Sequence, residues 1–529
     1  MPRSDETKEA EMRRLILGDY ILSVIRRVNM SDETRNVSWI KEVALPTLAK
    51  VAYSRDTKYN PSLSDKTRNL FRNRLMSAFT HLLTDLKAFS YPCDLLLQFA
   101  PDAVAMDAGI TKAKDSAVAT MEKLIKKTKK ASAQDKAPLH ALALLYSLVI
   151  FQLYNGEPEA VSILDELKLC YDKLIRHKDT QDADIEASEV LVELLLSFVS
   201  KPSALLRKVT EHVFSAFMSD MTEGGLKLMT DVLESGESLR GQQELFDQEP
   251  EDGDQMVVDD DDDDELDSDV EVVDMDADEG VLNGHLEDDD EDDDEDEASG
   301  DEEEDEDMQK LDDDLAKALG THRLDQDAGT ESDSDADMTD SEMMALDSKL
   351  VEIFSQRKKA PNKKQEQKDA KETMVNFKSR VLDLLEIYVK KQASNPLAFG
   401  LLLPLLQLMR TTKTKQLAEK VQNIIQAFAK ALKGMKKEGA ADVNASEQIK
   451  LLKAIHVEAS KDPSHIFARA ASTASLLIAS SLYRAEKGSV KKIATVYRDS
   501  QTSWVDGEVK MQASFFIDWV NWCQSHANS

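Results

Sequence analysis

The residues of this chain best suited to chemistry are the carboxylates of one interior run. Asp333, Asp335 and Asp337 alternate with serine and alanine, and enzymes of phosphoryl transfer use paired carboxylates to hold two metal ions. Such a site needs its carboxylates fixed on a rigid scaffold within a few ångströms of one another. These aspartates instead belong to a stretch so acidic that its side chains repel one another. We therefore do not expect metal-dependent catalysis from them.

No other sequence pattern supplies a reactive site. The chain has no glycine-rich phosphate loop, no HExxH zinc motif and no GxSxG nucleophile motif. Its nine histidines show no metal-ligand spacing with the three scattered cysteines, Cys93, Cys170 and Cys523. Sparse, unpaired cysteines are typical of a reducing, intracellular compartment. We predict a protein that is not an enzyme and has no cofactor and no metal site.

Charge divides the chain into an acidic stretch and a basic remainder. Residues 251–347 hold 47 of the 101 acidic side chains against three basic ones, a formal charge of −44, so the other residues carry about +9 of the total of −35. Because burial cannot offset the entropy of ordering such a stretch, we expect a disordered acidic tract at residues 247–342. Acidic runs often serve to solubilise a chain. The alternative is that this tract binds basic nuclear proteins, such as histones and ribosomal proteins, as DNA does.

Apolar residues outside the tract recur with the period of a helix. Residues 397–409 are apolar on all sides, which predicts an inner helix with Asn395 as its N-cap, Pro396 in its first turn and a kink near Pro404. Two further stripes predict amphipathic helices: Phe377, Val381, Leu384, Leu385 and Tyr388, and then Leu417, Val421, Ile424, Ile425, Phe428 and Leu432.

A helical hairpin is predicted by Val190–Val199, the turn Lys201-Pro202-Ser203 and a stripe that begins at Leu206. One hairpin cannot bury its own apolar face, so such units stack. We predict an all-α fold, an armadillo- or HEAT-like helical-hairpin solenoid, with helical repeat regions at residues 1–246 and 343–529 on either side of the acidic insert. A less regular helical array is the alternative. The apolar window Leu139–Tyr154 is shorter than the roughly 20 residues that span a bilayer, which predicts a buried helix and no membrane partner.

Two basic clusters could contact partners. Residues 123–130 (KLIKKTKK) suit the exposed end of a helix. A second cluster lies in a basic connector at 357–371, where an Ala-Pro-Asn break favours an extended, accessible chain. A nuclear import signal is the functional hypothesis for this second cluster. Its residues are Arg357, Lys358, Lys359, Lys363 and Lys364.

The tract also contains candidate phosphorylation sites. Ser268, Ser299, Ser332 and Ser334 each precede an acidic residue by three positions, which suits an acidophilic kinase of the casein kinase 2 type. Each phosphate would add about −1.5 to −2 charges. Against −44 that change is modest, so we expect phosphorylation to tune the affinity for basic partners.

A short repeat at the end of the tract predicts two docking helices. Its apolar residues recur at i, i+3, i+7 and i+11, on one narrow helical face, so each copy could fold as it docks into a groove. The alternatives are a chance match and, for the second copy, the first helix of the array that follows. The two copies consist of Met308, Leu311, Leu315 and Leu319, and of Met343, Leu346, Leu350 and Phe354.

The residues after the tract resemble the DNA polymerase phi family, also called the Myb-binding protein family. The resemblance rests on MMALDSKLVEIFSQRK (343–358), FKSRVLDLLEIYVKKQASNPL (377–397) and LLLPLLQLMR (401–410), which follow a long acidic stretch. The resemblance implies an armadillo-like nucleolar protein that is involved in ribosomal RNA gene transcription. Despite the family's name, this part shows no polymerase palm or metal motif. Family members extend further at the N-terminus, so we expect an N-terminally shortened member or a fragment.

We therefore predict a nuclear and nucleolar scaffold that acts in rRNA gene transcription, ribosome biogenesis and transcriptional regulation. Transcription or ribosome-assembly factors would bind the helical array, basic proteins would bind the tract, and rDNA or rRNA is a further candidate partner. The alternatives are a DNA-directed DNA polymerase, as the family name suggests, and an importin-like carrier or histone chaperone.

Overall fold

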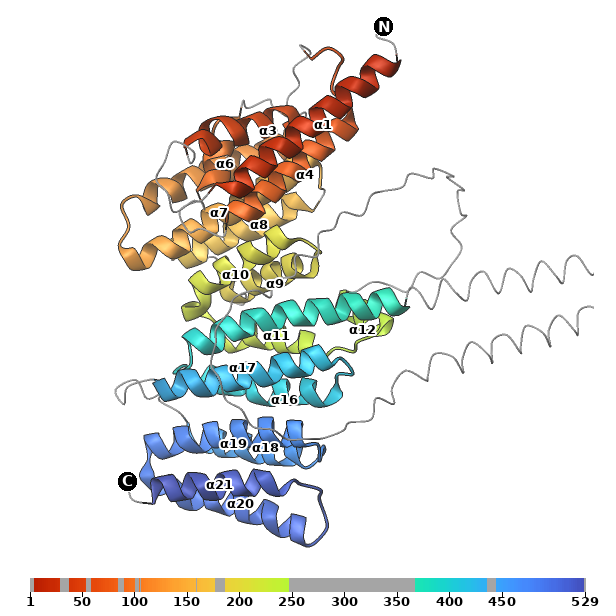
Figure 1. The fold of residues 1–529 in the computed structure, drawn as a ribbon. Coiled ribbons are helices and arrows are strands. Elements are labelled where there is room, and N and C mark those ends of the chain that lie inside the picture. The colour runs from red at the N-terminus through yellow and green to blue at the C-terminus, as the bar shows by residue number, and fades with distance from the viewer. Residues whose placement is uncertain are drawn as a thin grey trace, which may run out of the picture. The chain divides into compact units, whose positions relative to one another are not determined.

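The computed structural model describes residues 4–28, 38–53, 59–83, 90–99, 104, 106–157, 159–176, 186–246, 367–434 and 444–527. Within these ranges every regular element is a helix and no strand is present (Figure 1). The predicted all-α fold is confirmed. The acidic insert predicted at 247–342 lies outside the described residues.

The helices before the acidic tract differ widely in length. In chain order they are α1 (Ser4–Arg27), η1 (Ile40–Ala44), α3 (Leu45–Tyr53), α4 (Asp65–Leu82), α5 (Tyr91–Leu96), α6 (Ala108–Thr128), α7 (Ala133–Asn155), α8 (Ala160–Cys170), η3 (Tyr171–Ile175), α9 (Ala187–Ser200), α10 (Ala204–Phe217), η4 (Met218–Asp220), α11 (Glu223–Glu234) and α12 (Leu239–Phe246).

The described helices after the tract begin with a long one over residues 367–391. It is followed by α15 (Leu397–Gly400), α16 (Leu402–Thr411), α17 (Lys415–Gly434), α18 (Ala445–Ala459), α19 (His465–Ala485), η7 (Lys487–Ser489), α20 (Val490–Val505) and α21 (Ala513–His526).

Both chain segments belong to one compact unit, made of Met1–Leu245 and Lys371–Ser529. Its helices pack in two layers (Figure 1). In the first layer α6, α8, α9, α11, α16, α18 and α20 each contact the next helix. In the second layer α7 contacts α10, and α17, α19 and α21 follow one another. Helix 367–391 lies between α10 and α17 in the second layer. Its Tyr388 packs against Phe214 of α10, and Lys420 of α17 donates a hydrogen bond to the Ser379 carbonyl. This is the helical-repeat arrangement that the sequence predicted.

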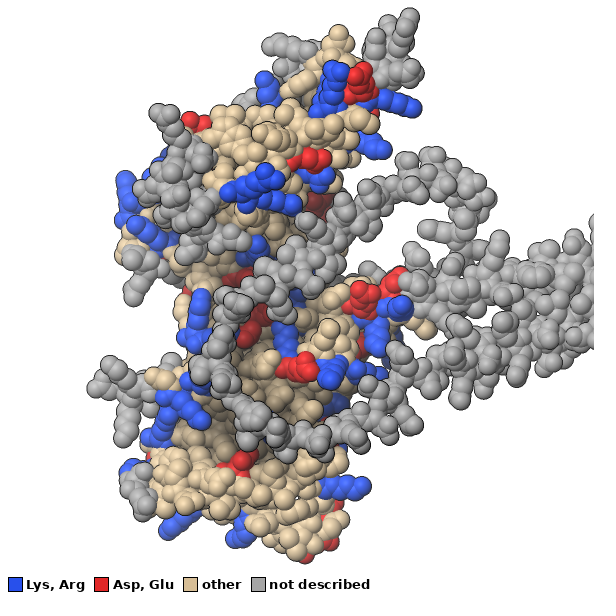
Figure 2. Space-filling view, in the orientation of Figure 1, with Lys and Arg blue, Asp and Glu red and all other residues tan. Residues whose placement is uncertain are grey.

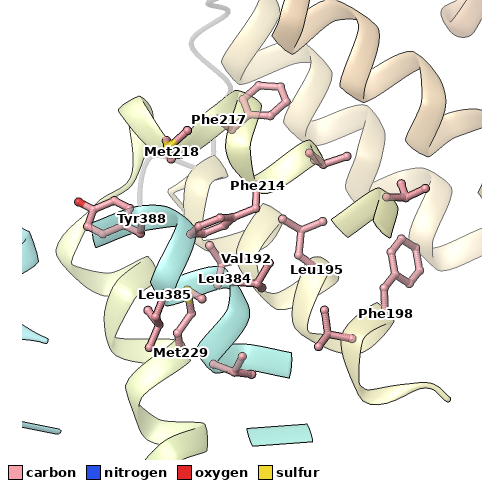
Figure 3. Packing of buried hydrophobic residues seen from close by; sticks show 14 of the residues in the cluster. Val192, Leu195, Phe198, Phe214, Phe217, Met218, Met229, Leu384, Leu385 and Tyr388 are labelled. Atoms are coloured by element: carbon pink, nitrogen blue, oxygen red, sulfur yellow. The ribbon is translucent and has the colours of Figure 1, made fainter. Parts of the chain in front are cut away.

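The predicted stripes form the core of this unit. Every residue of the two stripes at 377–388 and 417–432 is at least nine-tenths buried. Figure 3 shows side chains of α9, α10, α11 and helix 367–391 interdigitating, among them Leu195, Phe214, Met229 and Leu385. Burial of this kind stabilises the fold by about 1.5–3 kcal/mol for each large apolar side chain. The core therefore includes residues from both sides of the tract.

The predicted hairpin at the α9–α10 turn is confirmed. α9 ends at Ser200, Pro202 lies in the turn, and the Ser203 hydroxyl accepts a hydrogen bond from the backbone N–H of Leu206 at 3.3 Å. This is N-cap geometry, which satisfies an amide of the first turn that has no partner within the helix.

The kink predicted near Pro404 is present. The helix breaks at Leu401, between α15 and α16, and Pro404 lies in the first turn of α16. Proline has no N–H for the carbonyl four residues earlier and its ring clashes with that carbonyl, so the disruption falls near Gly400. Asn395 does cap the start of α15, accepting from the Leu397 amide at 3.0 Å, but Pro396 precedes the first helical residue.

Two core helices are apolar and long. By length and composition alone, Asp135–Asn155 and His465–Ala485 could cross a membrane, but 83% and 67% of their most apolar windows are buried inside the fold. The buried helix predicted at Leu139–Tyr154 is therefore confirmed as part of α7. α7 is capped at its C-terminus by Gly156, whose φ of +88° would be strained for a residue with a Cβ atom.

Candidate interaction surfaces

An arginine links the chain that returns from the tract to the chain that precedes it. Nη1 of Arg380 donates to the carbonyl oxygens of Val199, Ser200 and Lys201, at 2.9, 3.4 and 3.0 Å. These carbonyls lie at the end of α9, where the helix lacks internal partners and its dipole favours a cation. Arg380 therefore fixes helix 367–391 to the C-terminus of α9.

A buried ion pair forms a second link between the same two segments. Nζ of Lys378 lies 3.5 Å from Oε1 of Glu237, and the two side chains are 3% and 12% exposed. Burial lowers the pKa of Lys378, and the charge of Glu237 opposes that shift. Each partner compensates a charge that would be costly to bury alone.

Lysines of the second layer reach from one helix to its neighbour. Lys208 of α10 donates to the Thr80 carbonyl of α4 at 3.1 Å. Lys391 donates to the Ser215 hydroxyl of α10 at 2.5 Å. Lys420 of α17 donates to the Ser379 carbonyl of helix 367–391 at 2.8 Å. Each step from α4 to α17 is therefore bridged by a cation.

Two arginines, Arg207 and Arg380, extend this series. Arg207 precedes Lys208 on α10, and its charge adds to the effect of burial in lowering the pKa of Arg380. We call this series the cation row; it consists of Arg207, Lys208, Arg380, Lys391 and Lys420.

Carboxylates lie among these cations without balancing them. Glu211 is 4.0 Å from Arg207, and Asp383 is 2.6 Å from Lys420. Within the described part of the chain, the five positive charges of the cation row thus exceed these two negative ones. In the space-filling view Lys and Arg are more prominent than Asp and Glu on the face shown (Figure 2), as expected for the basic remainder of the chain.

A groove of about 460 Å³ opens in the first layer where α11, α15 and α18 begin. The one-turn helix α15 and the break at Leu401 form part of its wall. On its polar side Nδ2 of Asn444 donates to Oε1 of Glu447 at 2.8 Å, whereas Oε1 of Gln448 is buried without a hydrogen-bond partner among the described residues. Its apolar lining suits the side chains of a bound polypeptide. That lining includes Leu226, Leu397, Leu401 and Leu451.

α1 presents an exposed apolar face. Met12, Ile16, Leu17 and Tyr20 are between 50% and 66% exposed. Met12, Ile16 and Tyr20 follow the i, i+4, i+8 spacing of one helical face, and Leu17 lies beside Ile16. A contiguous apolar face of this kind is a usual place for protein contacts.

A buried histidine of the C-terminal helices has the neighbours of a catalytic residue. Nδ1 of His456 lies 2.8 Å from the Ser500 hydroxyl, and Nε2 lies 3.0 Å from the Ser475 hydroxyl, which in turn lies 2.5 Å from the Tyr497 hydroxyl. Ser500 donates its own proton to the Val496 carbonyl at 3.1 Å. Nδ1–H of His456 therefore donates to Ser500, and Nε2 accepts from Ser475.

This network is structural. A nucleophilic serine must give its proton to the histidine and be open to a substrate. Ser500 gives its proton to a carbonyl, and Ser475, which donates to Nε2, is completely buried. His456 is 3% exposed, and burial lowers its pKa to about 3, which keeps the ring neutral. In the described part of the chain, no three His, Cys, Asp or Glu side chains converge as metal ligands. Burial also raises the pKa of Cys93 and Cys170 to about 12, which makes them poor nucleophiles.

One of the clusters proposed from the sequence is visible in the structure. Residues 123–130 form the end of α6 and the residue pair after it, with Lys123, Lys126, Lys127, Lys129 and Lys130 exposed. This is the exposed helix end that the sequence predicted. The import cluster at 357–364, the four phosphorylation sites and both docking helices lie outside the described residues.

A family model described as DNA polymerase phi matches residues 2–389. The chain belongs to this family. The match includes α1 to α12 and most of helix 367–391, and so extends well before the residues on which the sequence resemblance rested.

Similar proteins carry regulatory and binding names. The chain is 29% identical to "rDNA transcriptional regulator pol5" of Schizosaccharomyces pombe, over 98% of its own length and 54% of that protein. It is 28% identical to "rDNA transcriptional regulator POL5" of Saccharomyces cerevisiae, over 79% of its own length and 43% of that protein. It is 30% identical to human "Myb-binding protein 1A", over 59% of its own length and 23% of that protein. The chain thus spans about half the length, or less, of these relatives, and no solved structure matches it.

Sequence reasoning did not find the cation row or the His456 network. Lys208 and Lys391 are 183 positions apart, and isolated cations on helices give no signal of their own. The single available clue was the surplus of about +9 outside the tract, which shows that basic surface exists without showing where. His456 and Ser500 are likewise separated by 44 residues.

Proposed function

We propose that the chain is a nuclear scaffold that is located in the nucleolus. It acts in the transcriptional regulation of ribosomal RNA genes and in ribosome biogenesis. Its helical array binds transcription or ribosome-assembly factors, its acidic tract holds basic proteins such as histones and ribosomal proteins, and rDNA or rRNA is a further partner. The work is done by binding, without an enzymatic step.

The observation that carries this proposal is the two-layered helical array together with its relatives. Helical repeats expose extended surfaces suited to protein partners, and this array offers a groove at α11, α15 and α18 and an apolar face on α1. The two relatives that match the largest shares of the chain are named as regulators of rDNA transcription. The family's polymerase name favours an enzyme, but the histidine network described above is buried and closed to a substrate.

Partner capture from nucleolar extract tests this function. The intact chain should retain basic ribosomal proteins or histones, and a variant lacking residues 251–347 should lose these while it keeps array-bound factors. Replacement of Lys358, Lys359, Lys363 and Lys364 by alanine should reduce nuclear accumulation. Primer extension by the purified chain should be absent. Extension above background, or equal capture by both proteins, would overturn the proposal.

A further inference from the structure

We propose that the groove at α11, α15 and α18 is a docking site for a polypeptide segment that carries an apolar side chain next to a lysine or arginine. The inference rests on the proposed function and deepens it, since it names where the array would bind its factors and which side chains those factors would present.

Three helices supply the groove, each with one face. The lining residues recur at i, i+3, i+4 and i+7 on α11, from Glu223 to Thr230, and on α18, from Asn444 to Leu451. α16 contacts both of these helices, and the one-turn α15 precedes it. Gly400 of α15 also lines the groove, and a Cβ atom at that position would have no neighbour within 4 Å. The helix between the two walls therefore leaves a gap that a side chain from another polypeptide can fill.

The lining of this gap suits an apolar side chain. Leu226 and Leu401 are at least nine-tenths buried, whereas Leu397 and Leu451 are partly exposed beside them. The volume of about 460 Å³ lies within the roughly 300–1,000 Å³ that is typical of binding sites. Apolar surface buried against these four leucines would supply the main part of the binding free energy.

A buried acceptor at the groove lacks a donor. Gln448 lines the groove and is 6% exposed, and its Oε1 has no hydrogen-bond partner among the described residues. An unpaired buried oxygen is costly, so a ligand that donates to it gains affinity. The terminal torsion of a glutamine side chain is soft, so the amide can turn toward a donor in the groove. A backbone N–H is such a donor, which favours a polypeptide over a purely apolar molecule.

Carboxylates on both walls favour a cation next to the apolar side chain. Glu223 begins α11 and Glu447 lies in the first turn of α18, and both residues are exposed. The Glu223 carboxylate has no ion pair within the described part of the chain. Lys227 is the one cation among the described residues that line the groove, so the two carboxylates exceed it. A lysine or arginine of the ligand would compensate this excess at the starts of the two helices.

The experiment selects dodecapeptides from a displayed random library on the full chain, after every peptide that binds the G400F variant has been removed. Phenylalanine at position 400 fills the groove, whereas the acidic tract is the same in both proteins. The removal step therefore discards peptides that the tract holds. G434F is the matched control, because Gly434 ends α17 and a Cβ atom there also has no neighbour within 4 Å. Circular dichroism melting verifies that both variants fold.

We expect the selected peptides to share an apolar residue next to lysine or arginine. By fluorescence anisotropy, such a peptide should bind G400F about tenfold or more weakly, because its side chain meets an occupied site, and should bind G434F within about twofold of the unmodified chain. Q448M removes the acceptor with little change of shape and should weaken binding about fivefold.

The charge of the groove is tested in the same assay. E223Q/E447Q keeps its shape and should weaken binding about fivefold or more, whereas E234Q/E419Q removes two exposed carboxylates elsewhere and should change it less than twofold. Both variants change the net charge by the same amount, so a long-range effect of charge would appear equally in both.

Four outcomes would overturn the inference: no peptide enriched after the removal step, selected peptides that are acidic or uncharged, equal affinity for G400F and G434F, or equal affinity for the two charge variants. A peptide of residues 343–354 that displaces the selected peptides would also overturn it, since the occupant would then be a segment of this chain. Residues 251–347 are unchanged in all these variants, so they should still capture basic proteins through the tract. Failure at the groove is thus distinct from failure of the proposed function.

Discussion

Two regions of the array bury polar groups by opposite chemistry. At the junction of the two chain segments, Lys378 faces Glu237 and Arg380 holds the end of α9. Among the C-terminal helices, His456 is held between Ser500 and Ser475 with its ring neutral. One region fixes its helices with charges, and the other fixes them with a chain of neutral hydrogen bonds.

The difference decides what each region can offer a partner. Charges at the junction act over a longer range than neutral hydrogen bonds, and Arg380 of the junction belongs to the cation row. A neutral network whose donors and acceptors are all satisfied creates no comparable electrostatic field at the surface and contributes only to stability. The junction thus combines structure with a capacity for binding, whereas the network around His456 has a structural role.

The largest effect is expected from breaking the buried ion pair at the junction. K378M leaves the Glu237 carboxylate buried without its cation, which should lower the free energy of unfolding by about 3–5 kcal/mol. Hydrogen exchange of the amides of helix 367–391 measures this loss.

The exposed pair Lys390–Glu386 provides the matched control. Its lysine is 54% exposed, so K390M should cost less than about 0.5 kcal/mol. The double variant K378M/E237L should recover most of the loss, because an apolar pair leaves no buried charge. Equal exchange in K378M and K390M would show that the pair does not hold the junction.

A somewhat smaller effect is expected in the neutral network. H456L removes a donor and an acceptor, leaving the hydroxyls of Ser475 and Ser500 short of a partner, and should cost about 2–3 kcal/mol. Hydrogen exchange of α18 and α20 measures it. His465 is exposed at the start of α19, so H465L should be near neutral. Similar costs for both variants would contradict the role given to His456.

The sequence predicts the elements of the fold better than the contacts between them. The stripe at Leu417–Leu432 and the turn at Lys201–Ser203 are local patterns, so they could be read directly. The break near Pro404 could also be predicted, to within one turn, because the steric effect of the proline acts on the preceding turn. Lys378 and Glu237 are 141 residues apart, and no local pattern distinguishes a lysine that will be buried from one that stays exposed.

The two regions should also differ in their response to acid. Burial holds the pKa of His456 at about 3 in the folded state, below the ordinary value of 6.5 that applies when the chain is unfolded. Between these values the unfolded state binds a proton that the folded state does not, so the stabilisation is complete above pH 6.5 and declines as pH falls toward 3. At pH 5 the loss is about 2 kcal/mol.

Exchange of α18 amides between pH 7 and pH 5, corrected for intrinsic exchange rates, measures this decline. H456Q has no titrating ring, so its decline should be shallower than that of the unmodified chain by about the same 2 kcal/mol. Parallel declines in both proteins would mean that another group causes the acid sensitivity.

The smallest effect is expected at two helix starts, one in each region. The Ser203 hydroxyl accepts from the Leu206 amide at the start of α10, so S203A should lower the free energy of unfolding by about 1 kcal/mol. Ser464 holds the same position before α19 but makes no side-chain cap bond, so S464A should cost only a few tenths of a kcal/mol. Because α10 carries Arg207 and Lys208, S203A should also loosen the cation row, which exchange at the first-turn amides of α10 would detect. If S464A costs as much as S203A, the cap hydrogen bond is not what fixes the start of α10.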